Sequence, residues 1–223
     1  MGAAARSFED VLAEALELGY AEADPTFDVE GVDAAHKLTI LASMAFGTRF
    51  DFSGVYCEGI SAITPQDIEF AQELGYRIKH LGIAKAHASG IELRVHPTLL
   101  PERALLANVD GGLNAVRLEG DAAGQTVYSG AGAGRLPTAS AVVADIVDIA
   151  RAGSQAVPML GIPVSTLNDR PVLPIDDVES AWYLRLDVED RPGVMSELAR
   201  SLGEEGISIE ALIQKPPKAQ ASS

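Results

Sequence analysis

Apolar and polar residues follow two different periods along this chain. In four stretches the apolar residues recur every three or four positions, which is the spacing of one face of a helix. The third stretch has the clearest start, because Thr64 can cap it, Pro65 suits its first turn and Asp67 completes a capping box. The spacing predicts helices over residues 7–20, 33–46, 63–76 and 136–151.

Shorter stretches with the composition of strands flank two turn signals. The sequence predicts one hairpin around "HASG", between strands at 77–86 and 91–97. A second hairpin is expected around "DAAG", between strands at 114–120 and 125–130. Hairpins covered by helices give an α+β fold class with a mostly antiparallel sheet.

The character of the sequence changes after the fourth predicted helix. Prolines become frequent and periodicity weakens, so residues 153–180 are expected to be a linker that follows a first domain over residues 1–152. Residues 181–215 then predict a strand at 182–190, a helix and a second strand at 207–215, which together make a βαβ segment. The polar end at 216–223 is expected to be disordered.

Composition narrows the possible classes of protein. Apolar residues make up 47% of the 223, and no apolar run reaches the roughly 20 residues that a transmembrane helix needs. The first ten residues lack the apolar core of a signal peptide, so we expect a cytoplasmic location. A net charge of −15 argues against binding to nucleic acid or an anionic membrane. The single cysteine, Cys57, excludes an internal disulfide, and the four scattered histidines predict no metal site.

An unusual group of charges lies at the start of the second predicted helix. The stretch "EADPTFDVEGVDAAHK", residues 22–37, places five acids before one lysine. Asp33 and Lys37 are four residues apart and share a helix face with Ile40, Leu41 and Met44. One interpretation is a surface ion pair that only supports the helix. The other is a polar site in which acids bind a cationic group, while the lysine, protonated at neutral pH, transfers a proton.

A glycine-rich stretch precedes the fourth predicted helix. Gly130, Gly132 and Gly134 alternate in "YSGAGAGRLPTAS", between a predicted strand and that helix. Glycines let backbone amides approach an anion, and a helix N-terminus adds partial positive charge. The stretch lacks the G-x-G-x-x-G order of a dinucleotide fingerprint, so a tight turn explains it equally well.

Several of these segments together resemble the catalytic domain of homoserine dehydrogenase. The resemblance covers about residues 7–170, through "LGYAEADPTFDVEGVDAAHKLTILASMAFG", "GIELRVHPTLLP", "GGLNAVRLEG" and "GAGAGRLPTASAVVADIV". It implies an NAD(P)H-dependent enzyme that interconverts L-aspartate 4-semialdehyde and L-homoserine in threonine and methionine biosynthesis, and a homodimer. Residues 181–215, which include "DRPGVMSELA", resemble the first βαβ half of an ACT regulatory domain.

The resemblance also assigns roles to the charged residues. Lys37 matches the proton-transferring lysine of the family, and Asp33 matches the aspartate beside the reacting hydroxyl. Glu22 and Asp28 match acids of the substrate pocket. This agrees with the chemistry of homoserine, because its ammonium group is a ligand that acids bind well. By the same resemblance the dinucleotide contacts Gly130, Gly132 and Gly134.

The sequence departs from the family in a respect that bears on function. The family's dinucleotide-binding domain, with its G-x-G-x-x-G fingerprint, does not occur in these 223 residues. Hydride transfer requires the nicotinamide to be held close to the substrate carbon, so we expect this chain alone to bind NAD(P)H weakly or not at all and to have negligible activity. The alternative is a non-catalytic amino-acid-binding or regulatory chain of the same family. We also expect the apolar side of the helix at 136–151 to be exposed or to self-associate.

Overall fold

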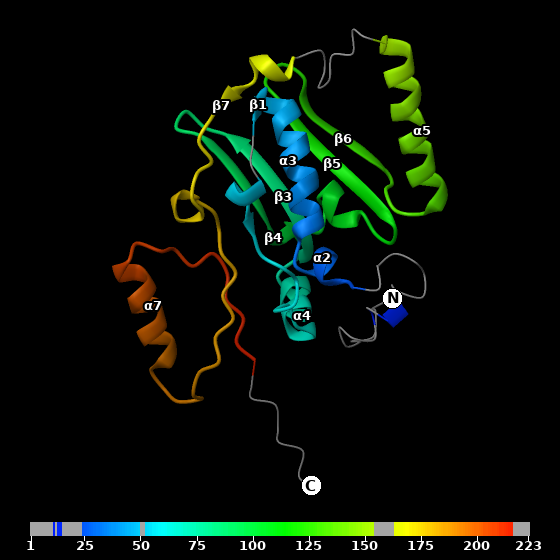
Figure 1. Cartoon of the computed structure of the whole chain (residues 1–223). Coiled ribbons are helices and arrows are strands. Elements are labelled where there is room, and N and C mark those ends of the chain that lie inside the picture. The colour runs from blue at the N-terminus through cyan, green and yellow to red at the C-terminus, as the bar shows by residue number, and fades with distance from the viewer. Residues whose placement is uncertain (1–10, 12, 15–23, 50–51, 154–162, 216–223) are drawn as a thin grey trace.

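The computed structural model describes residues 11, 13–14, 24–49, 52–153 and 163–215 (Figure 1). The helices are α2 (Thr26–Val29), α3 (Val32–Phe46), α4 (Pro65–Glu73), α5 (Arg135–Ala152) and α7 (Val194–Glu204). The strands are β1 (Thr48–Arg49), β2 (Tyr56–Cys57), β3 (Tyr76–Ala86), β4 (Ile91–Pro101), β5 (Leu113–Gly120), β6 (Gly124–Ala131) and β7 (Asn168–Asp169). Short 3-10 helices lie at η1 (Phe52–Gly54), η2 (Leu105–Asn108), η4 (Val164–Thr166) and η5 (Ile175–Asp177).

The expected helices form close to their predicted bounds. Helix α3 lies between Gly31 and Gly47, both of which have the left-handed backbone that glycine adopts most easily. Helix α4 has the predicted capping box, in which Thr64 Oγ1 accepts the Asp67 N–H at 3.3 Å and Asp67 Oδ2 accepts the Thr64 N–H at 2.8 Å. Of the helix expected at 7–20, residues 11, 13 and 14 are helical, and the remainder lies outside the described residues.

The hydrophobic core lies between helix α3 and the first hairpin. Strands β3 and β4 pair antiparallel from Tyr76↔Pro101 to Ala86↔Ile91, and β2 adds to β4 in parallel. Alternate β4 residues face α3, as the two-residue period of a strand requires. The buried residues of this cluster are Ala35, Leu38, Ala42, Ile91, Leu93 and Val95. The prediction of an α+β fold with mostly antiparallel pairing is confirmed.

The second hairpin and helix α5 form an arm beside this core (Figure 1). Strands β5 and β6 pair antiparallel from Leu113↔Ala131 to Gly120↔Gly124. No described residue of α5 is buried. As expected, its apolar residues are exposed: Leu136, Val142, Val143, Ile146, Val147 and Ile149.

The segment expected to be a linker pairs with the core in its described part, residues 163–180. Strand β7 lies parallel to β1, and the Thr48 hydroxyl donates to the Asn168 carbonyl, a partner 120 residues away. Further along, Val172 forms a bridge with Ile91, and the Leu173 N–H donates to the Ile91 carbonyl at 2.9 Å. Residues 168–173 therefore continue the edge of the core.

The ACT-like segment has its expected helix, α7, but differs from the prediction on either side of it. The described residues at 182–190 and 207–215 form no strand. A strand exists only through hydrogen bonds to a neighbour, and no strand of the described chain lies beside either stretch. Their apolar side chains are accordingly exposed, including Trp182, Leu184, Leu186, Val188, Ile207, Ile209 and Leu212. The tail at 216–223 lies outside the described residues.

Candidate functional site

The lysine and aspartate of the predicted site form an ion pair on the first turns of α3. Lys37 Nζ lies 2.5 Å from Asp33 Oδ2, and the two side chains are 68% and 39% exposed. Among the residues that the structure describes, the pair therefore lies at the surface. The stripe expected to continue from it is also exposed at Ile40 and Leu41, because α3 turns its other face, with Ala35 and Leu38, to the core.

The acids before α3 occupy different positions. Asp28 lies in α2 and is exposed, so its carboxylate is open to a ligand. Asp24 instead binds Thr26, whose N–H donates to Asp24 Oδ1 at 3.1 Å. Hydrogen bonding from the Thr26 side chain, followed by that from its backbone, lowers the pKa of Asp24. Glu22 lies outside the described residues. The structure thus brings Asp33 and Lys37 together and places Asp28 on the short helix that leads into α3.

The turn between α2 and α3 leaves no space for a side chain at its glycine. Gly31 has φ +79°, and a Cβ there would lie 2.7 Å from the His80 ring. The Gly31 carbonyl accepts the Ala35 N–H at 2.9 Å and so starts the hydrogen bonding of α3. His80 is held in turn by a 2.9 Å hydrogen bond between its Nε2 and the Glu58 carbonyl. The direction of α3, and with it the position of Lys37, therefore depends on strand β3 beneath the turn.

Residues 58–63 support the same turn from a second side. The Ile60 N–H donates to the Val29 carbonyl at 2.9 Å, and the Ser61 hydroxyl donates to the Glu30 carboxylate. A Cβ on Gly59 would lie 2.8 Å from the Val29 carbonyl oxygen. The two stretches are therefore packed backbone against backbone. This support was missed at the sequence level, and only the glycine at position 59 hints at it.

An aromatic stack is formed by His36, the neighbour of Lys37 in α3. The His36 ring stacks on Phe52 with a centroid distance of 4.1 Å and on Phe27 with a centroid distance of 5.7 Å. His36 thus holds α2 and η1 against α3. The stack fixes the helix that carries Asp28 relative to the one that carries Lys37.

The glycine loop joins β6 to α5 and is exposed throughout. Gly130 pairs with Asn114 in the hairpin, and a Cβ on Gly132 would lie 2.2 Å from Asn114 Nδ2. Gly134 has φ +117° and starts α5 without a side-chain cap. The amides of the first turn of α5 are therefore not capped by a side chain, which suits an anionic ligand. Figure 1 shows this loop toward the same lower end of the view as the start of α3.

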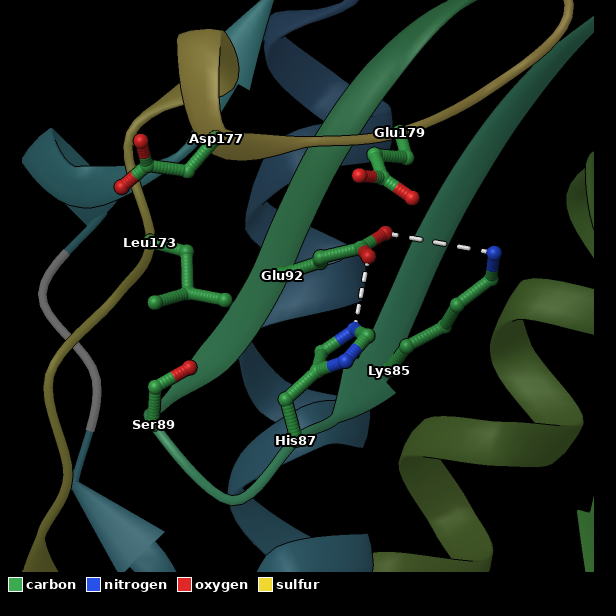
Figure 2. A pocket seen from close by; sticks show the side chains of 7 residues that line it. All are labelled: Lys85, His87, Ser89, Glu92, Leu173, Asp177 and Glu179. Carbon is green, nitrogen blue, oxygen red and sulfur yellow. Dashed lines mark hydrogen bonds and ion pairs between the residues drawn. The ribbon is translucent and has the colours of Figure 1, made fainter.

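A separate pocket of about 460 Å³ lies where residues 173–179 cross the end of the first hairpin. Figure 2 shows Glu92 pointing into it between Lys85 and His87, with Asp177 and Glu179 on the opposite wall. Glu92 is buried and accepts from His87 Nε2 at 2.6 Å and Arg94 Nε at 3.2 Å. Burial raises the pKa of Glu92, but these partners outweigh burial and lower it. The alternation of Glu92 and Arg94 with apolar residues is typical of a strand with two different faces, but it does not predict this network.

The described residues show neither a metal-binding cluster nor a membrane-spanning helix. In the part of the chain that the structure describes, no group of three or more His, Cys, Asp or Glu side chains is arranged to hold a metal ion. None of the described helices is both long enough and apolar enough to cross a membrane.

Comparisons with known proteins agree with the geometry. The family model "Homoserine dehydrogenase" matches residues 1–147, and the model "ACT domain" matches residues 182–222. A homoserine dehydrogenase of Pseudomonas aeruginosa is 58% identical over 219 residues, which is 96% of this chain and 50% of the relative. One of Helicobacter pylori is 48% identical, with 94% and 49% covered.

A solved structure has the same arrangement. The homoserine dehydrogenase from Thiobacillus denitrificans superimposes with a TM-score of 0.84 at 53% identity, over 94% of this chain and 49% of that one. The chain thus spans about half the length of the curated relatives it matches. The family model covers well over half of the chain, and the two curated relatives are 58% and 48% identical over most of it, so this chain belongs to the homoserine dehydrogenase family.

Proposed function

We propose that this chain forms the substrate-binding part of a homoserine dehydrogenase, an enzyme that interconverts L-aspartate 4-semialdehyde and L-homoserine with NAD(P)H. The observation that carries the proposal is the Asp33–Lys37 pair on the exposed first turns of α3, in a chain of this family. An ion pair at such an open surface contributes little to stability, usually less than about 1 kcal/mol. We infer a chemical role for the pair instead, because α2, which carries the exposed Asp28, leads directly into α3.

Each residue of the candidate site has its own role in the proposed reaction. Glu22 holds the ammonium group of the substrate, and Asp28 is a further acid of the substrate pocket. Lys37 donates a proton to the aldehyde oxygen during reduction or takes the hydroxyl proton in the reverse direction. Asp33 keeps the Lys37 ammonium in place through the 2.5 Å contact. NAD(P)H supplies the hydride when it is bound. The loop with Gly130, Gly132 and Gly134 offers backbone amides to its phosphates.

Two further parts of the proposal concern the chain as a whole. The glycine loop offers only one wall to a dinucleotide, so these 223 residues alone bind NAD(P)H weakly and turn over negligibly. The exposed apolar residues of α5 and of the second hairpin support a homodimer, because such a surface is rarely left in water. Cytoplasm is the compartment that this biosynthetic chemistry favours.

Calorimetric titration of the chain with L-homoserine tests the substrate site. We expect saturable binding that weakens at least about tenfold in Glu22→Gln, because an ammonium partner is lost. Asp24→Asn is the matched control, since Asp24 is bound to the Thr26 backbone, and its affinity should stay within about twofold. Equal losses in both variants would show a general charge effect and refute the assignment. Tight NADPH binding by the same chain would refute the weak-cofactor part.

A further inference from the structure

The ACT-like segment is attached to the body at one buried carboxylate. Asp67 is only 4% exposed, although it lies in the first turn of α4. Its Oδ1 accepts the Tyr183 hydroxyl at 2.9 Å, and its Oδ2 accepts Arg185 Nη1 at 2.7 Å. The Arg185 guanidinium also donates to Thr64 Oγ1 at 2.5 Å. Tyr183 and Arg185 are two residues apart in an extended part of the chain, so both side chains reach the same side.

The electrostatics favour a charged Asp67 at neutral pH. Burial raises the pKa of its carboxyl, but hydrogen bonds from Thr64 and Tyr183 and the charge of Arg185 outweigh burial and lower the pKa below the ordinary 3.8. Burial, followed by the contact with Asp67, raises the pKa of Tyr183 to about 12, so its hydroxyl stays a donor at all working pH values. A charged acceptor with neutral and cationic donors makes hydrogen bonds about twice as strong as neutral ones.

A second contact holds the far end of the segment to the same helix. Lys215 Nζ donates to Glu69 at 3.0 Å and to Glu73, and it lies 5.0 Å from the centre of the Phe70 ring. Helix α4 therefore receives the ACT-like segment at both ends, from Tyr183 to Lys215.

The cap of α4 leads directly into residues 58–63, which pack against the turn between Asp28 and Asp33 (the substrate turn). Thr64 follows Ile63, whose N–H donates to the Ile60 carbonyl at 3.0 Å. The Ile60 N–H in turn donates to the Val29 carbonyl at 2.9 Å, two residues before Gly31, the N-cap of α3. Tyr183 and Arg185 are thus connected with the turn between Asp28 and Asp33 by hydrogen bonds to Asp67 and Thr64, by the backbone from Thr64 to Ile60, and by the hydrogen bond from Ile60 to Val29.

We propose that Asp67 is a positioning residue that couples docking of the ACT-like segment to the geometry of the substrate turn. When Tyr183 and Arg185 are docked, the α4 cap and residues 58–63 are held in one arrangement, and Asp28, Asp33 and Lys37 are held with them. When the segment is released, residues 58–63 loosen and the acids lose their alignment. The catalytic consequence rests on the proposed function, whereas the mechanical coupling does not.

Amide hydrogen exchange of the full chain, followed by NMR, tests the coupling. The double variant Tyr183→Phe with Arg185→Gln removes the tether and leaves Thr64 and Asp67 in place. We expect the exchange rate of the Ile60 amide to rise about fivefold, the size of a typical coupling along such a path. Arg185→Lys keeps the charge and should restore part of the protection. Arg191→Gln is the matched control and should change nothing, because the ion pairs of Arg191 among the described residues are with Glu189 and Glu197 of its own segment.

Release of the segment is followed independently through Trp182, the only tryptophan of the chain and the neighbour of Tyr183. Its fluorescence anisotropy should fall in the double variant. A fall without any change at the Ile60 amide would overturn the coupling, and an unchanged anisotropy would show that these residues do not hold the segment. The affinity for L-homoserine should weaken about fivefold in parallel. If the wild-type chain binds no homoserine, the proposed function fails, while the Ile60 result still decides the coupling.

Discussion

Helices α3 and α5 are both rich in alanine, valine, isoleucine and leucine, yet their surroundings are opposite. Ala35 and Ala42 of α3 are 0% and 2% exposed, against a strand whose apolar residues are equally buried. Val143 and Ile146 of α5 are 57% and 59% exposed. The α3 face is covered by a hairpin of this chain, whereas the described residues offer α5 nothing comparable. An apolar stripe thus predicts that one face of a helix becomes buried. The stripe does not show which segment or partner covers that face.

This difference separates a part of the molecule that is stable by itself from one that depends on a partner. The α3–β3–β4 core owes its stability to burial within the chain. The β5–β6–α5 arm gains only from hairpin and helix hydrogen bonds until its apolar surface is covered.

The largest effect is expected from a cavity in the core. Leu93 is 2% exposed and packs in the cluster beneath α3, so Leu93→Ala should lower the free energy of unfolding by about 3 kcal/mol. Leu118→Ala in the arm is the matched change, and at low protein concentration it should cost less than about 0.5 kcal/mol. Urea denaturation of both variants measures the difference. Equal losses would mean that the arm is packed as tightly as the core.

The next effect concerns self-association through the arm. Val143→Glu combined with Ile146→Glu places charges on the exposed apolar side of α5, and should weaken a homodimer by about 2 kcal/mol or more. Sedimentation over a range of concentrations should show a shift toward the monomer mass, with unchanged helical content. A wild-type chain that stays monomeric at high concentration would contradict the dimer.

A smaller effect is expected from the buried carboxylate of α4. Asp67→Asn weakens its hydrogen bonds to Tyr183 and Arg185 and should lower stability at neutral pH by about 1–3 kcal/mol. The pKa of Asp67 is lower in the folded chain, so its contribution is complete above the ordinary value of 3.8 and is lost as pH falls through the folded pKa. Stability should therefore drop less steeply in acid for the variant than for the wild type. Asp148→Asn, on exposed α5, should leave the profile unchanged.

The smallest effect on stability is expected at the candidate site itself. Asp33→Asn breaks an ion pair whose lysine is 68% exposed, and should change the free energy of unfolding by less than about 0.5 kcal/mol. The same change should weaken homoserine binding or turnover markedly if the pair is functional. If Asp33→Asn changes neither stability nor the affinity for homoserine, the Asp33–Lys37 pair is only a surface ion pair.

The sequence predicted the local elements well, because their signals are local. The cap of α4 is formed by Thr64 and Asp67 as expected, and both hairpins form around the predicted turns. The pairing of Thr48 with Asn168 was not predicted, since two-residue strands 120 positions apart carry no periodic signal. The predicted strands of the ACT-like segment did not form, because a strand pattern shows a tendency to pair and does not supply the neighbour.

For the candidate site, the sequence predicted the ion pair but not its support. The four-residue spacing placed Lys37 beside Asp33, and the structure agrees. Among the described residues, Lys37 is exposed, because the core face of α3 is the one with Ala35 and Leu38. Contacts such as Ile60 with Val29 and Arg185 with Asp67 join distant segments through single hydrogen bonds, so no pattern of residues announces them.

The most direct test of the account is the role of Lys37 in a complete enzyme. These 223 residues can replace the matching half of the Pseudomonas aeruginosa homoserine dehydrogenase, and NADPH oxidation with L-aspartate 4-semialdehyde can be followed. We predict an active chimera in which Lys37→Met lowers kcat at least about 100-fold, while KM changes little. Lys85→Met, at the far end of the first hairpin, should keep the full rate. A Lys37→Met chimera that turns over at the unaltered rate would contradict the central claim.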